Sequence, residues 1–229
     1  MIDGNQNKGD YSTKGIKAYN EITILNGNIV IQSYDDSIHA NNDVTLENGS
    51  SPLGNVTISG GNLTLSSNDD AIHADNKVLI SSSTINILTS YEGIEGNNVE
   101  ILSGNISVIS SDDGILFEGG NIVVISNGRF DSSIDTEKGY KYTGGNIIGI
   151  GLSGGMSNES TKASNFSSIG KSTNLNLTKD NFLIVENIVN IKMPVSMNAF
   201  IVCLGNQNQI STATNVSSTL DNNGICWLI

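Results

Sequence analysis

The sequence predicts an all-β protein, built as a right-handed parallel β-helix with three strands and about 22 residues per coil and followed by a C-terminal β section. Two observations predict this fold. A short motif with a central isoleucine recurs along the first two thirds of the chain, and brief alternating apolar segments between recurrences are separated by Gly, Asn or Ser. Such segments are too short for helices, and parallel crossover connections are almost always right-handed.

The repeat is seen in the spacing of its isoleucines, which are 22, 34, 22, 21 and 19 residues apart. We interpret the long interval as one repeat plus an insertion of 12 residues, because Val44-Thr45-Leu46 is echoed by Val56-Thr57-Ile58. Stacked coils would place the isoleucines in one column of the core. The column contains Ile16, Ile38, Ile72, Ile94 and Ile115, with Ile134 as a weaker match.

Two regions are expected from this pattern. Residues 1–155 would form the β-helix, with an inserted loop near 47–55. Residues 156–229 would form β-strands that pack on the helix or cap it, because an open solenoid end exposes a sheet edge. The cysteines of the second region, Cys203 and Cys226, are either two buried thiols or a disulfide between neighbouring strands. The strand-like runs of this region are Phe182 to Val185, Ile188 to Met193, Asn198 to Leu204 and Gly224 to Ile229.

Acidic residues precede the repeat isoleucines at constant spacing, which predicts two acidic columns on adjacent coils. The first column contains Asp36, Asp70, Glu92 and Asp113, and the second contains Asp35, Asp69 and Asp112. Coils stack about 4.8 Å apart, where two carboxylates repel by roughly 3.5 kcal/mol at an effective dielectric of 20. We expect no lysine or arginine in these columns, which end at Thr13-Lys14. The pattern therefore favours a bound cation.

Calcium suits such columns because it takes six to eight oxygen ligands, whereas zinc and copper prefer nitrogen or sulfur and magnesium demands a stricter octahedron. The alternative is a solvated acidic edge whose carboxylates are kept apart by screening and by raised pKa values. Each explanation accounts for the spacing.

Four other side chains accompany the acidic columns. His39 and His73 share one position of the repeat and would point outward if their neighbouring isoleucines point inward. They are either stacked surface residues or groups that bind a transition metal or transfer protons. Tyr34 and Tyr91 flank the acidic residues and are candidates for stacking on a sugar ring.

The charge of the chain excludes some partners. It carries 23 acidic and 11 basic residues, a net charge of −12, so it lacks the basic surface that general nucleic-acid binding requires. Binding to an anionic membrane surface is disfavoured for the same reason. No apolar run approaches the roughly 20 residues of a membrane span, so we expect no membrane insertion.

The repeat motifs together resemble a known family. They are Asp-Asp-Ser-Ile-His-Ala-Asn-Asn-Asp-Val-Thr-Leu at 35–46, Asp-Asp-Ala-Ile-His-Ala-Asp-Asn at 69–76, Ser-Tyr-Glu-Gly-Ile-Glu-Gly at 90–96, Ser-Ser-Asp-Asp-Gly-Ile at 110–115 and the final-coil stretches at 131–135 and 142–151. The pattern is similar to the calcium-binding β-helix carbohydrate-binding domains on the surface of cellulose-degrading anaerobic bacteria, whose architecture is like that of pectate lyases. The resemblance covers about residues 14–155.

The resemblance implies a secreted or cell-surface protein that binds plant cell-wall polysaccharide, cellulosic or pectic, with the help of calcium. By position, the calcium ligands would be Asp35, Asp36, Asp69, Asp70, Glu92, Asp112 and Asp113, with Asp131 and Asp135 as further candidates. The expected function is non-catalytic binding of polysaccharide, with Tyr34, Tyr91, His39 and His73 as candidate sugar contacts.

Two alternatives compete with that function. A pectate-type lyase would need a basic side chain near the metal, and the candidates are Arg129, the only arginine, and Lys77. A structural surface protein that associates with itself is the other alternative, because stacked coils can meet end to end.

Overall fold

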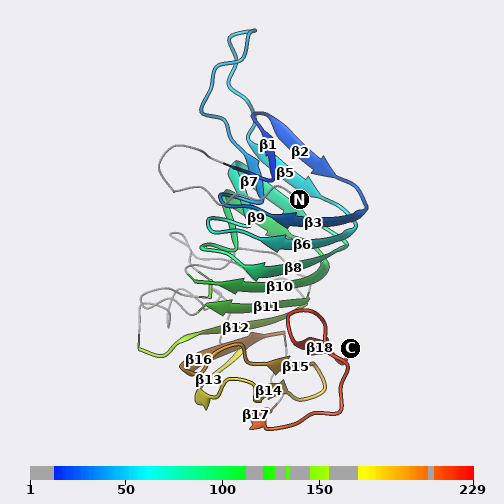
Figure 1. The fold of residues 1–229 in the computed structure, drawn as a ribbon, viewed down its shortest axis with the longest axis vertical. Coiled ribbons are helices and arrows are strands. Elements are labelled where there is room, and N and C mark those ends of the chain that lie inside the picture. The colour runs from blue at the N-terminus through cyan, green and yellow to red at the C-terminus, as the bar shows by residue number, and fades with distance from the viewer. Residues whose placement is uncertain (1–12, 112–120, 127–132, 135–144, 155–169, 206–208) are drawn as a thin grey trace.

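A computed structural model describes residues 13–111, 121–126, 133–134, 145–154, 170–205 and 209–229. The described residues form β-strands and turns with no helix, so the all-β prediction is confirmed. It follows that no helix in this part of the chain is long and apolar enough to cross a membrane. The strands stack along one long axis, with the first strands at one end and the C-terminal strands at the other (Figure 1).

Two sheets make up most of the stack. The first contains β1 (Ile16–Ala18), β2 (Glu21–Ile24), β4 (Ile38–Ala40), β5 (Asn55–Ile58), β7 (Ile72–Ile80) and β9 (Ile94–Ile101). The parallel part of the second contains β3 (Asn28–Gln32), β6 (Asn62–Ser66), β8 (Ser83–Thr89), β10 (Gly104–Ser110), β11 (Asn121–Ser126) and β12 (Asn146–Leu152). Strands that are neighbours in a sheet come from successive repeats, so each repeat contributes to both sheets.

The register of the parallel strands matches the repeat read from the sequence. Ile16 pairs with Ile38, Ile38 with Ile72, and Ile72 with Ile94. Ile115 lies outside the described residues. The predicted isoleucine column is therefore confirmed for its first four members.

A shared core fills the space between the two parallel sheets. In β5, Val56 and Ile58 are fully buried while Asn55 and Thr57 are partly exposed, which is the alternation of a strand with one face inward. In β6, Leu63 supplies the core from the opposite sheet. Alternating short segments thus form strands here because every second side chain is buried.

The loop expected near 47–55 is part of a longer strand-free segment, which runs from residue 41 to residue 54. Residues 44–46 form no strand, whereas the echo of that segment forms β5, which pairs with β2 on one side and β7 on the other. The reason is burial: Val56 and Ile58 are 0% exposed, and Val44 and Leu46 lie in a partly exposed loop. Of the two copies, the later one continues the sheet.

The stack changes from parallel to antiparallel at β12. There β16 (Met197–Leu204) pairs antiparallel with β12, and β13 (Gly170–Leu177) pairs with β16. Side chains of β16 alternate between two cores, since Val202 faces the inter-sheet core and Ile201 faces a second core. This double burial explains the unbroken apolar run from Ala199 to Leu204.

A third sheet covers the second core. It is antiparallel, in the order β17 (Ile210–Ala213), β14 (Phe182–Val185), β15 (Val189–Lys192) and β18 (Ile225–Trp227). Strands were expected at β14, β15, β16 and β18, and these four expectations are confirmed; β13 and β17 were not anticipated, because their sequences are polar. Both cysteines are free thiols, but only Cys203 is buried and Cys226 is partly exposed, so the expectation of two buried thiols is confirmed for Cys203 alone.

Candidate functional site

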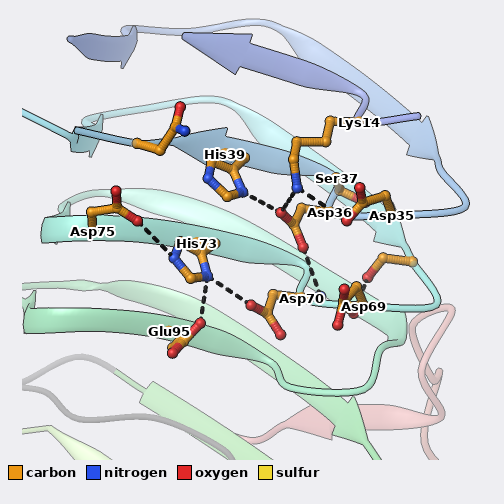
Figure 2. A network of polar contacts seen from close by, with 12 residues as sticks. Lys14, Asp35, Asp36, Ser37, His39, Asp69, Asp70, His73, Asp75 and Glu95 are labelled. Carbon is orange, nitrogen blue, oxygen red and sulfur yellow. Dashed lines mark hydrogen bonds and ion pairs between the residues drawn. The ribbon is translucent and has the colours of Figure 1, made fainter. Parts of the chain in front are cut away.

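The predicted acidic columns, their neighbours in the repeat and one lysine form a connected network, which we call the acidic edge. It lies where chain segments enter β1, β4, β7 and β9 of the first sheet (Figure 2). Its members are Lys14, Asp35, Asp36, His39, Asp69, Asp70, His73, Asp75 and Glu95. The in-register stacking of the repeats explains why residues from separate repeats meet there.

Lys14 corrects one expectation drawn from the sequence. It lies two residues before Ile16, as Asp36 lies two before Ile38, so it belongs to the first acidic column. Its ammonium contacts Asp35 Oδ1 at 3.0 Å and also contacts Asp36 Oδ2. The expectation of a column without lysine was therefore wrong: a cation at the same offset partly neutralises the carboxylates.

Asp36 is the most tightly held carboxylate of the edge. Its side chain is 4% exposed, and it contacts Lys14, the Nδ1 atom of His39 and the backbone N–H of Asp70. Burial by itself would raise the pKa of Asp36, but the hydrogen bonds from His39 and Lys14 outweigh it and lower the pKa to about 2. Burial likewise opposes the charge of Lys14, yet its aspartate partners raise its pKa.

His73 joins three carboxylates. Its Nδ1 atom contacts Asp70 Oδ2 at 2.8 Å and also contacts Glu95, and its Nε2 atom lies 3.1 Å from Asp75 Oδ1. Burial disfavours its charged form, but the hydrogen bonds to Asp70 and Glu95 raise the pKa of His73 to about 11. Burial, together with Glu95, raises the pKa of Asp70 to about 7, and the hydrogen bond from His73 lowers that of Glu95.

The two histidines are stacked, as one of the sequence alternatives expected. His39 pairs with His73 in the register of β4 and β7, and their ring centroids are 4.5 Å apart with planes 5° from parallel. Each ring meets, through Nδ1, the aspartate three residues before it. The same Asp-x-x-His spacing in two repeats therefore gives both rings the same orientation.

The structure brings only some of the predicted calcium ligands together. One carboxylate oxygen from each of Asp35, Asp36 and Asp69 lies within 4.8 Å of the others. Glu92 aligns with this region through its carbonyl, which accepts a hydrogen bond from Ala71, but its carboxylate is in none of the three clusters that the described residues form. Asp70, also predicted as a ligand, lies instead in the cluster with His73 and Glu95. The other four predicted ligands and Arg129 lie outside the described residues; the ligands are Asp112, Asp113, Asp131 and Asp135.

The two tyrosines occupy different positions. The backbone N–H of Tyr91 bonds to the carbonyl of Asp69, which places Tyr91 at the position of the second acidic column, and its side chain is 47% exposed. Tyr34 lies one position further from its isoleucine and is partly buried. The two rings therefore do not stack in one column.

A second candidate site, which we call the Trp227 groove, lies on the second sheet and was missed by the sequence reasoning. It is an open groove of about 380 Å³ between β8, β10 and the C-terminal segment. Its lining includes Thr84, Asn86, Asn105, Ser107, Asp221 and Trp227. Trp227 is the only tryptophan in the chain, which was the available signal.

Hydrogen bonds anchor the C-terminal segment over the sheet. Asn223 Nδ2 donates to Ser107 Oγ, which in turn donates to Asn86 Oδ1 at 2.9 Å. Asp221 Oδ1 accepts from the backbone N–H groups of Asn223 and Ile225 at 2.9 and 2.8 Å. The groove thus has a fixed wall and combines an aromatic ring with amide and hydroxyl groups, a lining suited to a small polar ligand.

The fold and the two sites define a class: an all-β protein of stacked parallel strands with an acidic edge and an open groove whose lining mixes Trp227 with polar and aliphatic residues. A family model described as carbohydrate-binding domain-containing protein matches residues 3–53 and 50–138. Because these matches cover more than half of the chain, the protein belongs to this family. No curated protein and no solved structure matches the chain significantly.

Proposed function

We propose that the chain is a non-catalytic, calcium-dependent binding module for plant cell-wall polysaccharide, cellulosic or pectic, that acts at the cell surface or after secretion. Membership of the carbohydrate-binding family is the observation that carries the proposal. The platform for binding, in this proposal, is a right-handed parallel β-helix with three strands per coil. The in-register pairing of Ile16, Ile38, Ile72 and Ile94 supports that architecture.

The Trp227 groove is the surface that we propose for the sugar chain. Sugar rings combine apolar C–H faces with hydroxyl groups, so they are bound by an aromatic ring beside amide and hydroxyl groups. Trp227 supplies the ring, and Asn86 and Thr84 are polar neighbours. Lys77, a candidate base for the lyase alternative, instead donates to Glu100 Oε2 at 2.7 Å, which favours the non-catalytic function.

Calcium fits the cluster of Asp35, Asp36 and Asp69, because all three supply carboxylate oxygens within 4.8 Å of one another and calcium prefers oxygen ligands. The Lys14 ammonium already contacts two of these carboxylates, so the cluster accepts a positive charge. When bound, calcium would hold neighbouring repeats together. Asp35, Asp36 and Asp69 are the residues that would hold it.

The sugar proposal is tested by intrinsic fluorescence of the wild-type chain, whose single tryptophan reports on the groove directly. Cello-oligosaccharide or oligogalacturonate, titrated with and without calcium, should shift or quench the emission with saturation. The variant Trp227→Ala should weaken binding about tenfold by calorimetry, while the matched aromatic control Tyr91→Ala should bind as the wild type does. Absence of binding by the wild-type chain to either sugar would refute the function. Release of an unsaturated, ultraviolet-absorbing product would show instead that the chain is a polysaccharide lyase.

The calcium proposal has a test that uses Lys14. Because its ammonium competes with calcium for Asp35 and Asp36, Lys14→Gln should raise calcium affinity, whereas Asp69→Asn should lower it. Calorimetry with chelator-treated protein measures both. If neither variant alters calcium binding, the cluster is not the site.

A further inference from the structure

We propose that His39, His73 and Asp75 form a second cation site, one for a divalent transition ion such as zinc and distinct from the calcium cluster. One ligand atom from each of the three residues lies within 4.8 Å of the others. Their donor set contains two imidazole nitrogens and one carboxylate oxygen, which suits zinc and its neighbours in the first transition series and not calcium. The inference does not depend on sugar binding.

The orientation of the rings supports this site. Each Nδ1 atom is occupied by an aspartate, Asp36 for His39 and Asp70 for His73. Metal-binding histidines ordinarily have such a carboxylate on the nitrogen that does not bind the metal, which fixes the ring and leaves the other nitrogen for the ion. The stacked rings share one orientation, and Nε2 of His73 already lies 3.1 Å from Asp75 Oδ1 (Figure 2).

His39 provides the clearest sign of an available ligand atom. Its ring is largely buried, with 12% of the side chain exposed, and its contact with Asp36 occupies Nδ1. Among the described residues, its Nε2 atom has no hydrogen-bond partner. This atom is not among the fully buried, unpartnered side-chain atoms of the described residues, so an ion can reach it from solvent. It lies beside a second imidazole and a carboxylate, which are the other two ligands of the proposed site.

The charge around the rings suits a divalent ion, because carboxylates contact both of them. Asp36 contacts His39, and Asp70, Asp75 and Glu95 contact His73. These carboxylates would balance the charge of an ion held between the rings.

The test is zinc binding by the full chain after treatment with a chelator. Equilibrium dialysis should show one zinc ion that the double variant His39→Gln, His73→Gln binds at least tenfold more weakly. The control variant Asp35→Asn, Asp69→Asn should bind zinc as the wild type does while losing calcium. Cobalt added to the wild type should give visible absorption typical of nitrogen and oxygen ligation at low coordination number, a measurement that needs no variant.

The outcomes separate this site from the calcium cluster. Zinc affinity that is unchanged in the histidine variant, or lost in the Asp35 and Asp69 variant, would overturn the proposal. Absence of both zinc binding and a cobalt spectrum in the wild type would overturn it as well. Loss of zinc binding in the histidine variant alone, with calcium binding intact, is the expected result.

Discussion

The acidic edge and the Trp227 groove lie on different sheets of the same stack and use polar groups in opposite ways. At the edge, charged side chains from successive repeats converge, and their burial ranges from the Asp36 side chain, 4% exposed, to that of Glu95, 46% exposed. In the groove, neutral amides and hydroxyls such as Asn86 and Thr84 lie beside a partly exposed tryptophan. The repeat alone thus builds the acidic edge, whereas the groove requires the non-repetitive C-terminal segment.

The largest expected effect is on stability at the edge. Asp36→Ala would leave Lys14 and the ring of His39 without their buried partner, and loss of one partner of a buried ion pair costs about 3 kcal/mol. Chemical denaturation measures the free energy of unfolding. The control is Glu47→Ala, an exposed loop acid, which should change stability by no more than about 0.5 kcal/mol. An equal loss of unfolding free energy in the two variants would mean that Asp36 contributes no more to stability than an exposed acidic residue.

Calcium should produce the next largest effect. A ligand that binds only the folded chain adds about 2.7 kcal/mol of stability when its free concentration is a hundredfold above its dissociation constant. Melting experiments should therefore show stabilisation by calcium in the wild type and little in Asp35→Asn, Asp69→Asn. Trp227→Ala should respond to calcium as the wild type does, because the groove supplies no calcium ligand in this proposal.

The edge should also make stability depend on pH in chelator-treated protein. The folded-state pKa of His73 is raised from 6.5 to about 11, so its stabilising effect is complete below pH 6.5 and is lost as pH rises toward 11. The raised pKa of Asp70, from 3.8 to about 7, acts in the same direction at lower pH. We expect stability to decrease from mildly acidic toward alkaline pH.

His73→Gln checks the assignment of that pH effect. The variant should lose the decrease above pH 7 in denaturation experiments, while Trp227→Ala should keep it. The effect should be smaller than that of Asp36→Ala, because removing a proton leaves the packing intact. An unchanged alkaline decrease in His73→Gln would assign it to another group.

Sugar affinity should also distinguish the groove from the edge, with a change in free energy smaller than those above. Trp227→Ala should weaken binding about tenfold, or about 1.4 kcal/mol, because the apolar face that contacts the sugar is removed. Asp70→Asn should leave the affinity for a neutral cello-oligosaccharide unchanged. Calorimetry measures the sugar affinity of both variants. A larger loss of affinity in Asp70→Asn than in Trp227→Ala would place the sugar site at the acidic edge.

The smallest expected effect concerns the anchor of the groove. Ser107→Ala removes the hydroxyl that bonds Asn223 and Asn86 and should cost about 1 kcal/mol of stability. In Ser107→Ala, hydrogen exchange of backbone amides should become faster in β18 than in β7. Uniform protection in both strands would mean that this bond does not hold the C-terminal segment.

Much of the first sheet was predictable from sequence because the repeat fixes its register. The column that begins Ile16, Ile38 could be read from spacing, and the buried run in β16 from its continuous apolar character. Lys14 was read as the place where the acidic columns end, and its contacts with Asp35 and Asp36 were not anticipated, because the columns were defined by acidic residues alone. The signal for it was position, not residue type.

The Trp227 groove could not be predicted in the same way. Its anchor joins Ser107 to Asn223, two residues 116 positions apart in different parts of the fold. No periodicity links them, since β18 belongs to an antiparallel sheet and β10 to a parallel one. Only the packing of the C-terminal segment on the second sheet brings Trp227 beside Asn86 and Thr84.

The contacts of Asp36 and His39 also bear on how faithfully the strands assemble. A shift of β4 by one residue against β7 would exchange the faces of its side chains, so His39 would turn toward the isoleucine core and Ile38 toward water. Asp36 would at the same time lose the geometry of its contacts with Lys14 and with the backbone of Asp70. The network thus favours one register of β4 against β7, in a chain whose repeats share similar motifs.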